Sequence, residues 1–265
     1  MNGVSAPVIE VKDLVAHYGV RKILDEINFC VEPGEIRIII GGSGSGKTTL
    51  LRHLLGLHTP TRGSIRILDT DIAKAAIGQM HELRKKVGVA FQGGALFSSL
   101  TVGENIKLPL REHAKLDEKT MDIMVRLKLE VVNLSGFENL MPAQLSGGMV
   151  KRAAVARAII MDPKLLFFDE PSAGLDPVVS VELDELILRL REAMHMTIVV
   201  VTHELESAFK IADRITVLDH GRILTTGTID EIQASDNARV QDLLNRRPRT
   251  AEVNPDEYLH RLTEG

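Results

Sequence analysis

Cysteine is nearly absent from this chain of 265 residues, which contains Cys30 and no other. A single cysteine excludes an intrachain disulfide and a zinc cluster built on cysteines, and it fits a reducing compartment. Because a free cysteine usually packs as a small hydrophobic side chain, we expect Cys30 to be buried.

Long apolar runs and an excess of basic residues are also missing. The sequence has no run of about 18 apolar residues, the length that a helix needs to span a bilayer. Residues 1–7 lack the basic and apolar regions of a secretory signal. The net charge of −4 gives no support to broad nucleic-acid binding, although a local basic patch is compatible with it. We therefore expect no nucleic-acid partner, and any membrane role must come through a partner or through peripheral contact.

The central motif of the chain reads Gly41-Gly42-Ser43-Gly44-Ser45-Gly46-Lys47-Thr48-Thr49 and matches the phosphate-loop pattern G-x-x-x-x-G-K-[ST]. A β-branched run at 35–40 predicts a buried strand before it, and leucines at helical spacing predict a helix that begins near Lys47. The glycines allow successive N–H groups to turn inward around a polyphosphate at the positive end of this helix. Lys47 would reach the β- and γ-phosphates, and the Thr48 hydroxyl would bind Mg²⁺.

Two acidic residues follow a second strand-like run. The segment Leu165 to Phe168 is short and apolar, and Asp169 and Glu170 come directly after it. A carboxylate at the end of a buried strand can meet the Mg²⁺ held by Thr48, and Glu170 can orient or deprotonate an attacking water. Such a strand end is a weak signal alone, but it becomes strong downstream of a phosphate loop.

A serine and two glycines form a third motif, in the sequence Leu145-Ser146-Gly147-Gly148-Met149. At the N-terminus of the helix-like run that follows, these residues would form a second anion site. Judged alone, the motif is better interpreted as a flexible loop capped by Ser146.

The strand and helix patterns divide the chain into three parts. Weakly alternating strands near the N-terminus predict an antiparallel β layer, residues 93–161 have helical periodicity, and a β/α rhythm returns after them. With 44% hydrophobic and 26% charged residues, the composition is ordinary for a soluble protein. The later signals are short strands at 165–168 and 197–201, a hairpin across His220-Gly221, and capping boxes at Thr101 with Glu104 and at Thr228 with Glu231.

In order and spacing, these motifs resemble the ATP-binding cassette (ABC) family over nearly the whole chain. The resemblance implies an α/β fold, namely a P-loop NTPase with a RecA-like core, an antiparallel β layer and a helical subdomain. The nucleotide-binding domain would span 1–245, with the helical subdomain at about 93–161, and a C-terminal extension would span 246–265. Gly42 departs from the proline that is common in this loop but leaves every N–H donor in place.

The same resemblance assigns roles to individual residues. For the nucleotide, it implies adenine stacking by Tyr18, a signature at Ser146, Gly147 and Gly148, and a D-loop at Asp176. For Mg²⁺, it implies ligands at Thr48, at Asp169 and at Gln92 of the Q-loop. For catalysis, it implies roles for Glu170, the switch histidine His203, Gln92 and Lys47. The implied cofactors are ATP and Mg²⁺. Because each motif occurs once, the chain would pair head to tail with itself or with another cassette, so that the signature of one subunit closes ATP on the phosphate loop of the other.

A narrower resemblance is to the ATPases of Mla-type (MCE-associated) phospholipid transport systems. It is carried by 92–102, by 108–113, by Met149 in the signature, and by 257–262. It implies membrane permease partners, an MCE-type lipid-binding protein and a small regulatory subunit, at the cytoplasmic face of the inner membrane. The resemblance also implies that the C-terminal extension is ordered and contacts the neighbouring ATPase. Taken alone, a terminus is usually disordered, although Tyr258, Leu259 and Leu262 form an apolar face at helical spacing.

Three other functions use similar motifs. Transport of another substrate, such as polar amino acids, relies on the same chemistry. A soluble ABC protein of DNA repair or translation would need a long coiled-coil insertion or two fused cassettes, and neither is visible in the sequence. A regulatory nucleotide-binding module without turnover is disfavoured by the intact Glu170 and His203.

Overall fold

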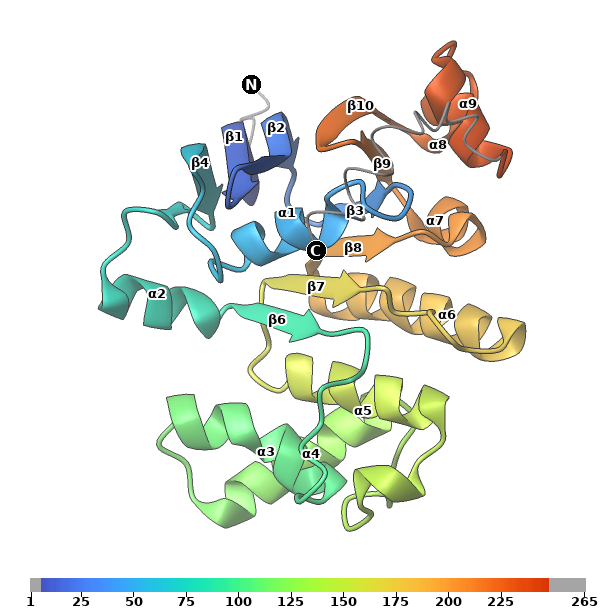
Figure 1. Ribbon diagram of the computed structural model, residues 1–265. Helices are drawn as coiled ribbons and strands as arrows, with labels where there is room; N and C mark the ends of the chain where they lie inside the picture. Colours follow the sequence, from blue (N-terminus) through green and yellow to red (C-terminus); the bar gives the residue numbers. More distant parts are fainter. Residues whose placement is uncertain (1–5, 248–265) are drawn as a thin grey trace, which may run out of the picture.

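The computed structural model describes residues 6–247, which form two sheets surrounded by helices (Figure 1). The larger sheet has six strands in the order β10-β9-β3-β8-β7-β6. They are β3 (Ile36–Ile40), β6 (Val87–Ala90), β7 (Leu165–Asp169), β8 (Thr197–Thr202), β9 (Arg214–Asp219) and β10 (Arg222–Gly227). The smaller sheet has the order β2-β1-β4-β5, built from β1 (Ile9–Tyr18), β2 (Arg21–Val31), β4 (Arg62–Ile67) and β5 (Thr70–Asp71). Its strands are all antiparallel, which confirms the predicted layer.

Neighbouring strands of the larger sheet, from β9 across to β6, run parallel to one another. The last strand, β10, is antiparallel to β9 and follows it through the turn at His220-Gly221, which confirms the predicted hairpin. Because the central strands are parallel, their carboxyl ends meet at a single edge of the sheet. In open α/β sheets this edge is where ligands bind.

Two separate cores cover the two faces of this sheet. Ile38, Phe168 and Val200 belong to the core shared with the helices below the sheet, whereas Ile39 and Phe167 belong to the core shared with the smaller sheet. Both phenylalanines are fully buried. Strands that are covered on both faces must be apolar at every position, and this explains the continuous apolar runs in the sequence.

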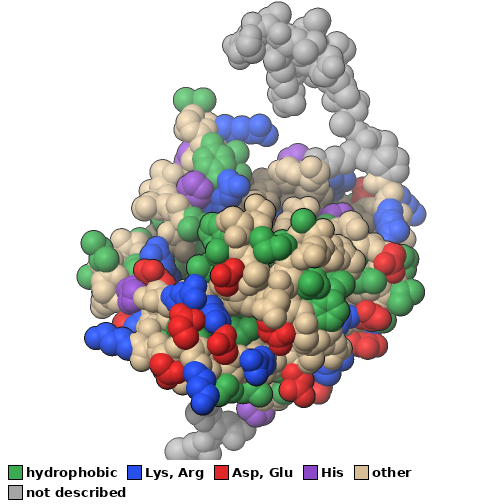
Figure 2. Space-filling model, turned by 90° about the horizontal axis from the view of Figure 1, so that it is seen from below, with side chains coloured by type: hydrophobic (Ala, Val, Ile, Leu, Met, Phe, Trp, Pro, Cys, Tyr) green, Lys and Arg blue, Asp and Glu red, His purple; other side chains and the backbone are tan. Residues whose placement is uncertain are grey.

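The helices are α1 (Lys47–Leu54), α2 (Ile77–Arg84), α3 (Val102–His113), α4 (Glu118–Val131), α5 (Gly147–Ala158), α6 (Pro177–Met194), α7 (Leu205–Ile211), α8 (Ile229–Gln233) and α9 (Ala238–Leu244), with a 3₁₀ turn at Pro142–Gln144. Helices α3, α4 and α5 lie together below the larger sheet, on the side away from the smaller sheet (Figure 1). They fall within the predicted helical insertion. Acidic, basic and apolar side chains are interspersed on the underside of the molecule (Figure 2).

Helix starts follow the capping chemistry that the sequence predicts. The Thr101 hydroxyl accepts a hydrogen bond from the backbone N–H of Glu104 at 3.2 Å, and the Glu104 carboxylate accepts one from the backbone N–H of Thr101 at 2.7 Å. Thr228 and Glu231 form the same reciprocal pair at α8. These caps satisfy N–H groups that would otherwise lack partners at the start of a helix.

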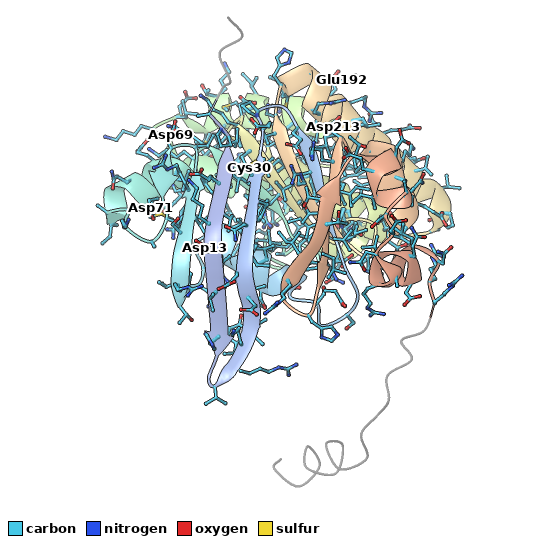
Figure 3. The ribbon with its side chains drawn as sticks, turned by 90° about the horizontal axis from the view of Figure 1, so that it is seen from above. Asp13, Cys30, Asp69, Asp71, Glu192 and Asp213 are labelled. Atoms are coloured by element: carbon cyan, nitrogen blue, oxygen red, sulfur yellow. The ribbon has the colours of Figure 1, made fainter. Side chains whose placement is uncertain are left out.

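Cys30 is exposed, so the expectation that it is buried was wrong. The side chains of β2 alternate between the two faces of the smaller sheet, and Ile27, Phe29 and Val31 take the inner face. Cys30 falls between them and therefore lies on the outer face of the sheet (Figure 3). Strand phase, rather than the usual preference of cysteine for the interior, decides its position.

Residues 1–5 and 248–265 lie outside the described residues. The predicted contact of Tyr258, Leu259 and Leu262 with a neighbouring ATPase falls in this region and stays a prediction. Among the helices of residues 6–247, none is both long enough and apolar enough to span a bilayer.

We predict that Asn105→Ala lowers the free energy of unfolding by about 2–4 kcal/mol, as measured by urea denaturation. The buried Asn105 amide accepts from the backbone N–H of Phe97 at 2.7 Å and donates to the carbonyl oxygens of Phe97, Leu100 and Thr101. Alanine would leave the Phe97 N–H without its acceptor and the Leu100 carbonyl oxygen without its donor. The carbonyl oxygens of Phe97 and Thr101 would each keep a backbone donor. The exposed Asn139→Ala is the control, and equal losses from the two variants would contradict the prediction.

Candidate functional site

The residues of the predicted nucleotide site follow neighbouring parallel strands at the carboxyl edge of the larger sheet. Strand β3 leads into the loop at Gly41, and β8, beside it, leads to His203. Strand β7, on the other side of β8, ends at Asp169 and is followed by Glu170. Beyond β7, strand β6 leads to Gln92. Parallel pairing therefore places residues that are far apart in the sequence along one edge.

The loop between β3 and α1 depends on glycine at two close approaches. A Cβ atom at Gly41 would lie 2.2 Å from the carbonyl oxygen of Leu218, and Gly46 has φ +108° with Leu24 packed against it. The Ser45 hydroxyl is buried and has no hydrogen-bond partner among the described residues. A tight glycine loop with an unpaired hydroxyl at a helix N-terminus fits a polar, anionic ligand such as the phosphates of ATP.

Lys47 is buried at the start of α1 and turns back over its own loop. Its ammonium group donates to the carbonyl oxygens of Gly41, at 2.8 Å, and Gly42, at 3.2 Å. Burial lowers the pKa of this ammonium group, and the nearby carboxylates of Glu170 and Asp169 oppose that shift. A charged group that is partly stripped of water and aimed into the loop is suited to bind phosphate oxygens.

A hollow of about 250 Å³ opens beside this loop and has Tyr18 at its rim. The Tyr18 ring is partly exposed and meets the His58 ring edge to face at 5.7 Å. Arg21 and Ile23 also line the hollow, although the sequence motifs did not indicate them. Arg21 lies opposite Tyr18 in the antiparallel register of β1 and β2. That register is the sequence signal that could have identified Arg21 as a residue of the site.

Asp169, the last residue of β7, carries a carboxylate whose charge is disfavoured in the folded chain. Burial, and then repulsion from Glu170, raises the pKa of Asp169, while Arg52, Lys47 and Lys151 act in the opposite direction. A divalent cation would relieve this repulsion, so Asp169 and the exposed hydroxyl of Thr48 fit the predicted Mg²⁺ ligands.

Glu170 forms a close pair with His203. Its carboxylate lies 2.8 Å from Nδ1 of His203 and accepts a hydrogen bond from the His203 backbone N–H at 3.2 Å. A carboxylate oriented by a histidine at the end of a strand is an arrangement that can position or deprotonate water. The structure thus brings together the two residues that the sequence resemblance names as catalytic glutamate and switch histidine.

The signature residues and Asp176 lie together at the starts of two other helices. Ser146 caps α5 by accepting from the Met149 backbone N–H, and Asp176 caps α6 by accepting from two backbone N–H groups. A Cβ atom at Gly148 would lie 2.6 Å from the Val179 side chain, so glycine allows the two helix starts to approach closely. The Gln92 side chain is exposed, and the backbone carbonyl oxygen of Gln92 accepts a hydrogen bond from the Lys151 ammonium group.

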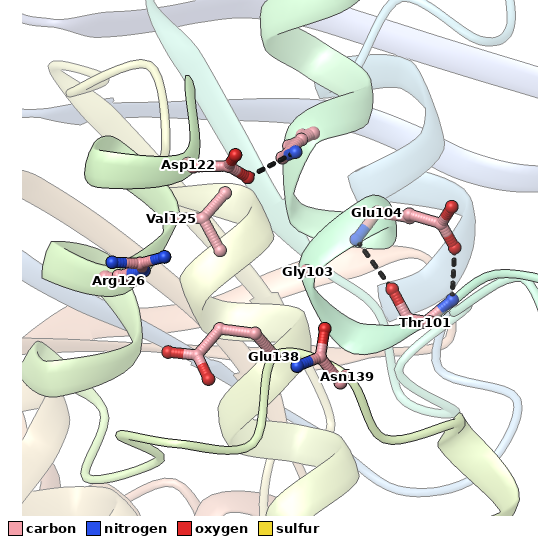
Figure 4. A pocket seen from close by; sticks show the side chains of 9 residues that line it. Thr101, Gly103, Glu104, Asp122, Val125, Arg126, Glu138 and Asn139 are labelled. Atoms are coloured by element: carbon pink, nitrogen blue, oxygen red, sulfur yellow. Dashed lines mark hydrogen bonds and ion pairs between the residues drawn. The ribbon is translucent and has the colours of Figure 1, made fainter. Parts of the chain in front are cut away.

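A larger hollow, of about 430 Å³, lies elsewhere, between α3 and α4 (Figure 4). Its lining carries the carboxylates of Glu104, Asp122 and Glu138 but only two basic side chains, Lys107 and Arg126, and Lys107 already binds Asp122. A lining with more acidic than basic groups disfavours a phosphate. Volume alone therefore does not identify the candidate site in this molecule.

A glycine-built phosphate loop, a buried lysine and strand-end carboxylates define a P-loop nucleoside triphosphatase. More narrowly, the chain belongs to the ABC transporter family, whose profile matches residues 24–173. It has the ABC ATPase fold that the sequence predicted: a solved dimeric ATP-binding cassette, in a post-hydrolysis state with ADP and phosphate, aligns with a TM-score of 0.77 at 29% identity. This alignment covers 83% of the present chain and 98% of the other.

Named relatives are more similar in sequence. The chain is 41% identical to the intermembrane phospholipid transport system ATP-binding protein MlaF of Haemophilus influenzae, over 89% of this chain and 90% of that protein. It is 38% identical to a Mycobacterium leprae protein named probable ribonucleotide transport ATP-binding protein mkl, over 90% of this chain and 69% of the relative.

We predict that Asp169→Asn raises the thermal midpoint of unfolding at pH 7.5 when nucleotide and Mg²⁺ are absent. Because the pKa of Asp169 is raised in the folded chain, the ionised carboxylate costs stability above that pKa. The cost disappears as the pH falls below the ordinary value of about 4, so the advantage of the variant should shrink toward acid pH. Exposed Asp236→Asn is the control; a midpoint for Asp169→Asn at or below that of the unaltered chain would contradict the prediction.

Proposed function

We propose that this chain is the ATP-hydrolysing subunit of a bacterial ABC transporter that powers phospholipid transport between the inner and outer membranes through a permease partner. The hydrogen-bonded pair of Glu170 and His203, at the same sheet edge as Lys47 and Asp169, carries the proposal of hydrolysis. The lipid substrate is supported by the identity to the MlaF protein of Haemophilus influenzae, which extends over 90% of that protein.

In the proposed reaction, the backbone N–H groups of 41–46 and the ammonium group of Lys47 bind the phosphates of ATP, while Tyr18 stacks on the adenine. Thr48, Asp169 and Gln92 would hold Mg²⁺, which neutralises charge on the β- and γ-phosphates. Glu170 orients the attacking water and accepts its proton, and His203 holds the Glu170 carboxylate in place through the contact at 2.8 Å.

The site is completed by a second copy of the chain in this proposal. Ser146, Gly147 and Gly148 are at the N-terminus of α5, whose positive end would face the γ-phosphate bound by the partner. Asp176 would lie beside this contact. The solved cassette to which the chain is similar is described as dimeric, which supports a head-to-tail homodimer. Loss of the γ-phosphate on hydrolysis would then loosen the dimer.

Further partners follow from the proposed transport role. Membrane permease subunits would contact 92–102, where the Phe97 side chain is 58% exposed. The complex would also contain an MCE-type lipid-binding protein and a small regulatory subunit, and the chain would lie peripherally at the cytoplasmic face of the inner membrane.

We predict that Glu170→Gln binds ATP normally but hydrolyses it at least about 100-fold more slowly, because the attacking water loses its base. The bound phosphates should still join two subunits, so the variant should accumulate as a dimer in ATP. Sedimentation measures the dimer, and phosphate release measures turnover. Exposed Glu192→Gln, on α6, is the control (Figure 3). A folded Glu170→Gln chain that stays monomeric in saturating ATP would contradict the head-to-tail arrangement.

The substrate is tested by purifying the chain from membranes with its permease and analysing the bound lipids. Reconstituted complex should move labelled phospholipid in an ATP-dependent manner. ATP-dependent movement of ribonucleotides or polar amino acids, without phospholipid, would instead favour the other transport function.

A further inference from the structure

Lys151 links the signature helix to the catalytic edge. It lies on α5, about one turn after Ser146, and its ammonium group donates to the carbonyl oxygen of Gln92 and, at 3.3 Å, to the carbonyl oxygen of Glu170. These two acceptors follow different strands, β6 and β7. A single lysine therefore joins a helix of the helical segment to two loops at the edge of the sheet.

The backbone of Glu170 depends on such contacts, because its φ of 47° lies in the left-handed region that residues with a side chain rarely adopt. Its N–H donates to the carbonyl oxygen of Val201 at 2.8 Å, and its carboxylate accepts from His203. The Glu170 carbonyl oxygen accepts from Lys151 and from the backbone N–H of Ala173, each at 3.3 Å. Contacts from four residues thus hold an unfavourable conformation that aims the carboxylate, and among them Lys151 is the one that comes from α5.

The loop at Gln92 is bound to α5 a second time, through Arg157. The guanidinium group of Arg157 donates to the carbonyl oxygens of Gly94, at 2.9 Å, and Ala95, at 2.7 Å. A Cβ atom at Gly94 would lie 2.7 Å from the Val150 side chain, so this loop packs directly on α5. Movement of α5 would therefore carry the loop with it, and Lys151 extends that linkage to Glu170.

We propose that Lys151 is a positioning residue for ATP hydrolysis. Through its hydrogen bonds, Lys151 makes the backbone positions of Glu170 and Gln92 depend on the position of α5. This inference rests on the proposed ATPase activity. Helix α5 carries Ser146 and Gly147 at its start. The helix that would contact the partner's nucleotide is therefore hydrogen-bonded to Glu170, the proposed general base of its own subunit. A shift of α5 relative to the sheet would break these hydrogen bonds and change the aim of the carboxylate.

The test is Lys151→Met in the full chain, which keeps the aliphatic stem and removes the three donors. We expect kcat to fall about tenfold to a hundredfold, the effect of losing charge-assisted hydrogen bonds to backbone carbonyls. The KM for ATP should change less than about twofold, because the phosphate loop and Tyr18 are untouched. Lys151→Arg should restore most of kcat, since its guanidinium group can reach a carbonyl acceptor.

Lys128→Met is the matched control, because Lys128 is a partly buried lysine of α4 whose ammonium group binds Asp162 instead. It should retain kcat even if its thermal midpoint falls. Equal kcat values for Lys151→Met and Lys128→Met, or a higher KM with unchanged kcat, would overturn the inference while leaving the ATPase intact. If Lys151→Met folds poorly, Lys151→Gln keeps an uncharged amide with two N–H donors on a shorter side chain and should give an intermediate kcat; full activity there would also overturn the inference. An unaltered chain without ATPase activity would instead refute the proposed function and, with it, this inference.

Discussion

The register of β3 against its neighbours decides where the catalytic groups lie, because Gly41 and His203 both follow directly from paired strands. The isoleucines of β3 are buried on both faces, so they do little to distinguish one register from the next. Arg37 supplies that distinction: it is buried, lies 2.6 Å from Glu35 and donates to the Thr216 hydroxyl at 3.1 Å. A shift of one residue would take the Arg37 guanidinium group away from the Thr216 hydroxyl, at a cost of about 1.5–3 kcal/mol for a buried hydrogen bond to a charged group.

Much of the fold could be predicted because its signals are local. The phosphate loop needs consecutive residues between a strand and a helix, and the caps at Thr101 and Thr228 need only a partner three residues away. The strand order could not be obtained in this way. Strand β3 pairs with β8 and β9, more than 150 residues later in the chain, and no periodicity in the sequence encodes that pairing. The RecA-like core was predicted only through the resemblance to the ABC family.

The sequence is least informative where one side chain serves a distant backbone group. Lys151 binds the carbonyl oxygen of Gln92, 59 residues away, and any residue type at position 92 would offer the same acceptor. Cys30 is exposed because of strand phase, which depends on the sheet packed against β2. The nucleotide contact of Asp176 stays a prediction, and its carboxylate caps α6. Unlike a helix cap, a hydrogen bond to a backbone group far away in the sequence leaves no pattern of residue types, so only the folded structure reveals it.

The candidate site is held together against its own electrostatics and conformational preferences. Burial and Glu170 disfavour the charge on Asp169, burial disfavours the charge on Lys47, and Glu170 itself adopts a left-handed backbone. The cores on both faces of the sheet supply the stability that makes this arrangement tolerable. A bound cation and polyphosphate would offset the two electrostatic costs, at Asp169 and Lys47, in the folded chain but not in the unfolded one. The same groups that weaken the free chain therefore increase its stabilisation by nucleotide, so binding and folding are coupled at this edge.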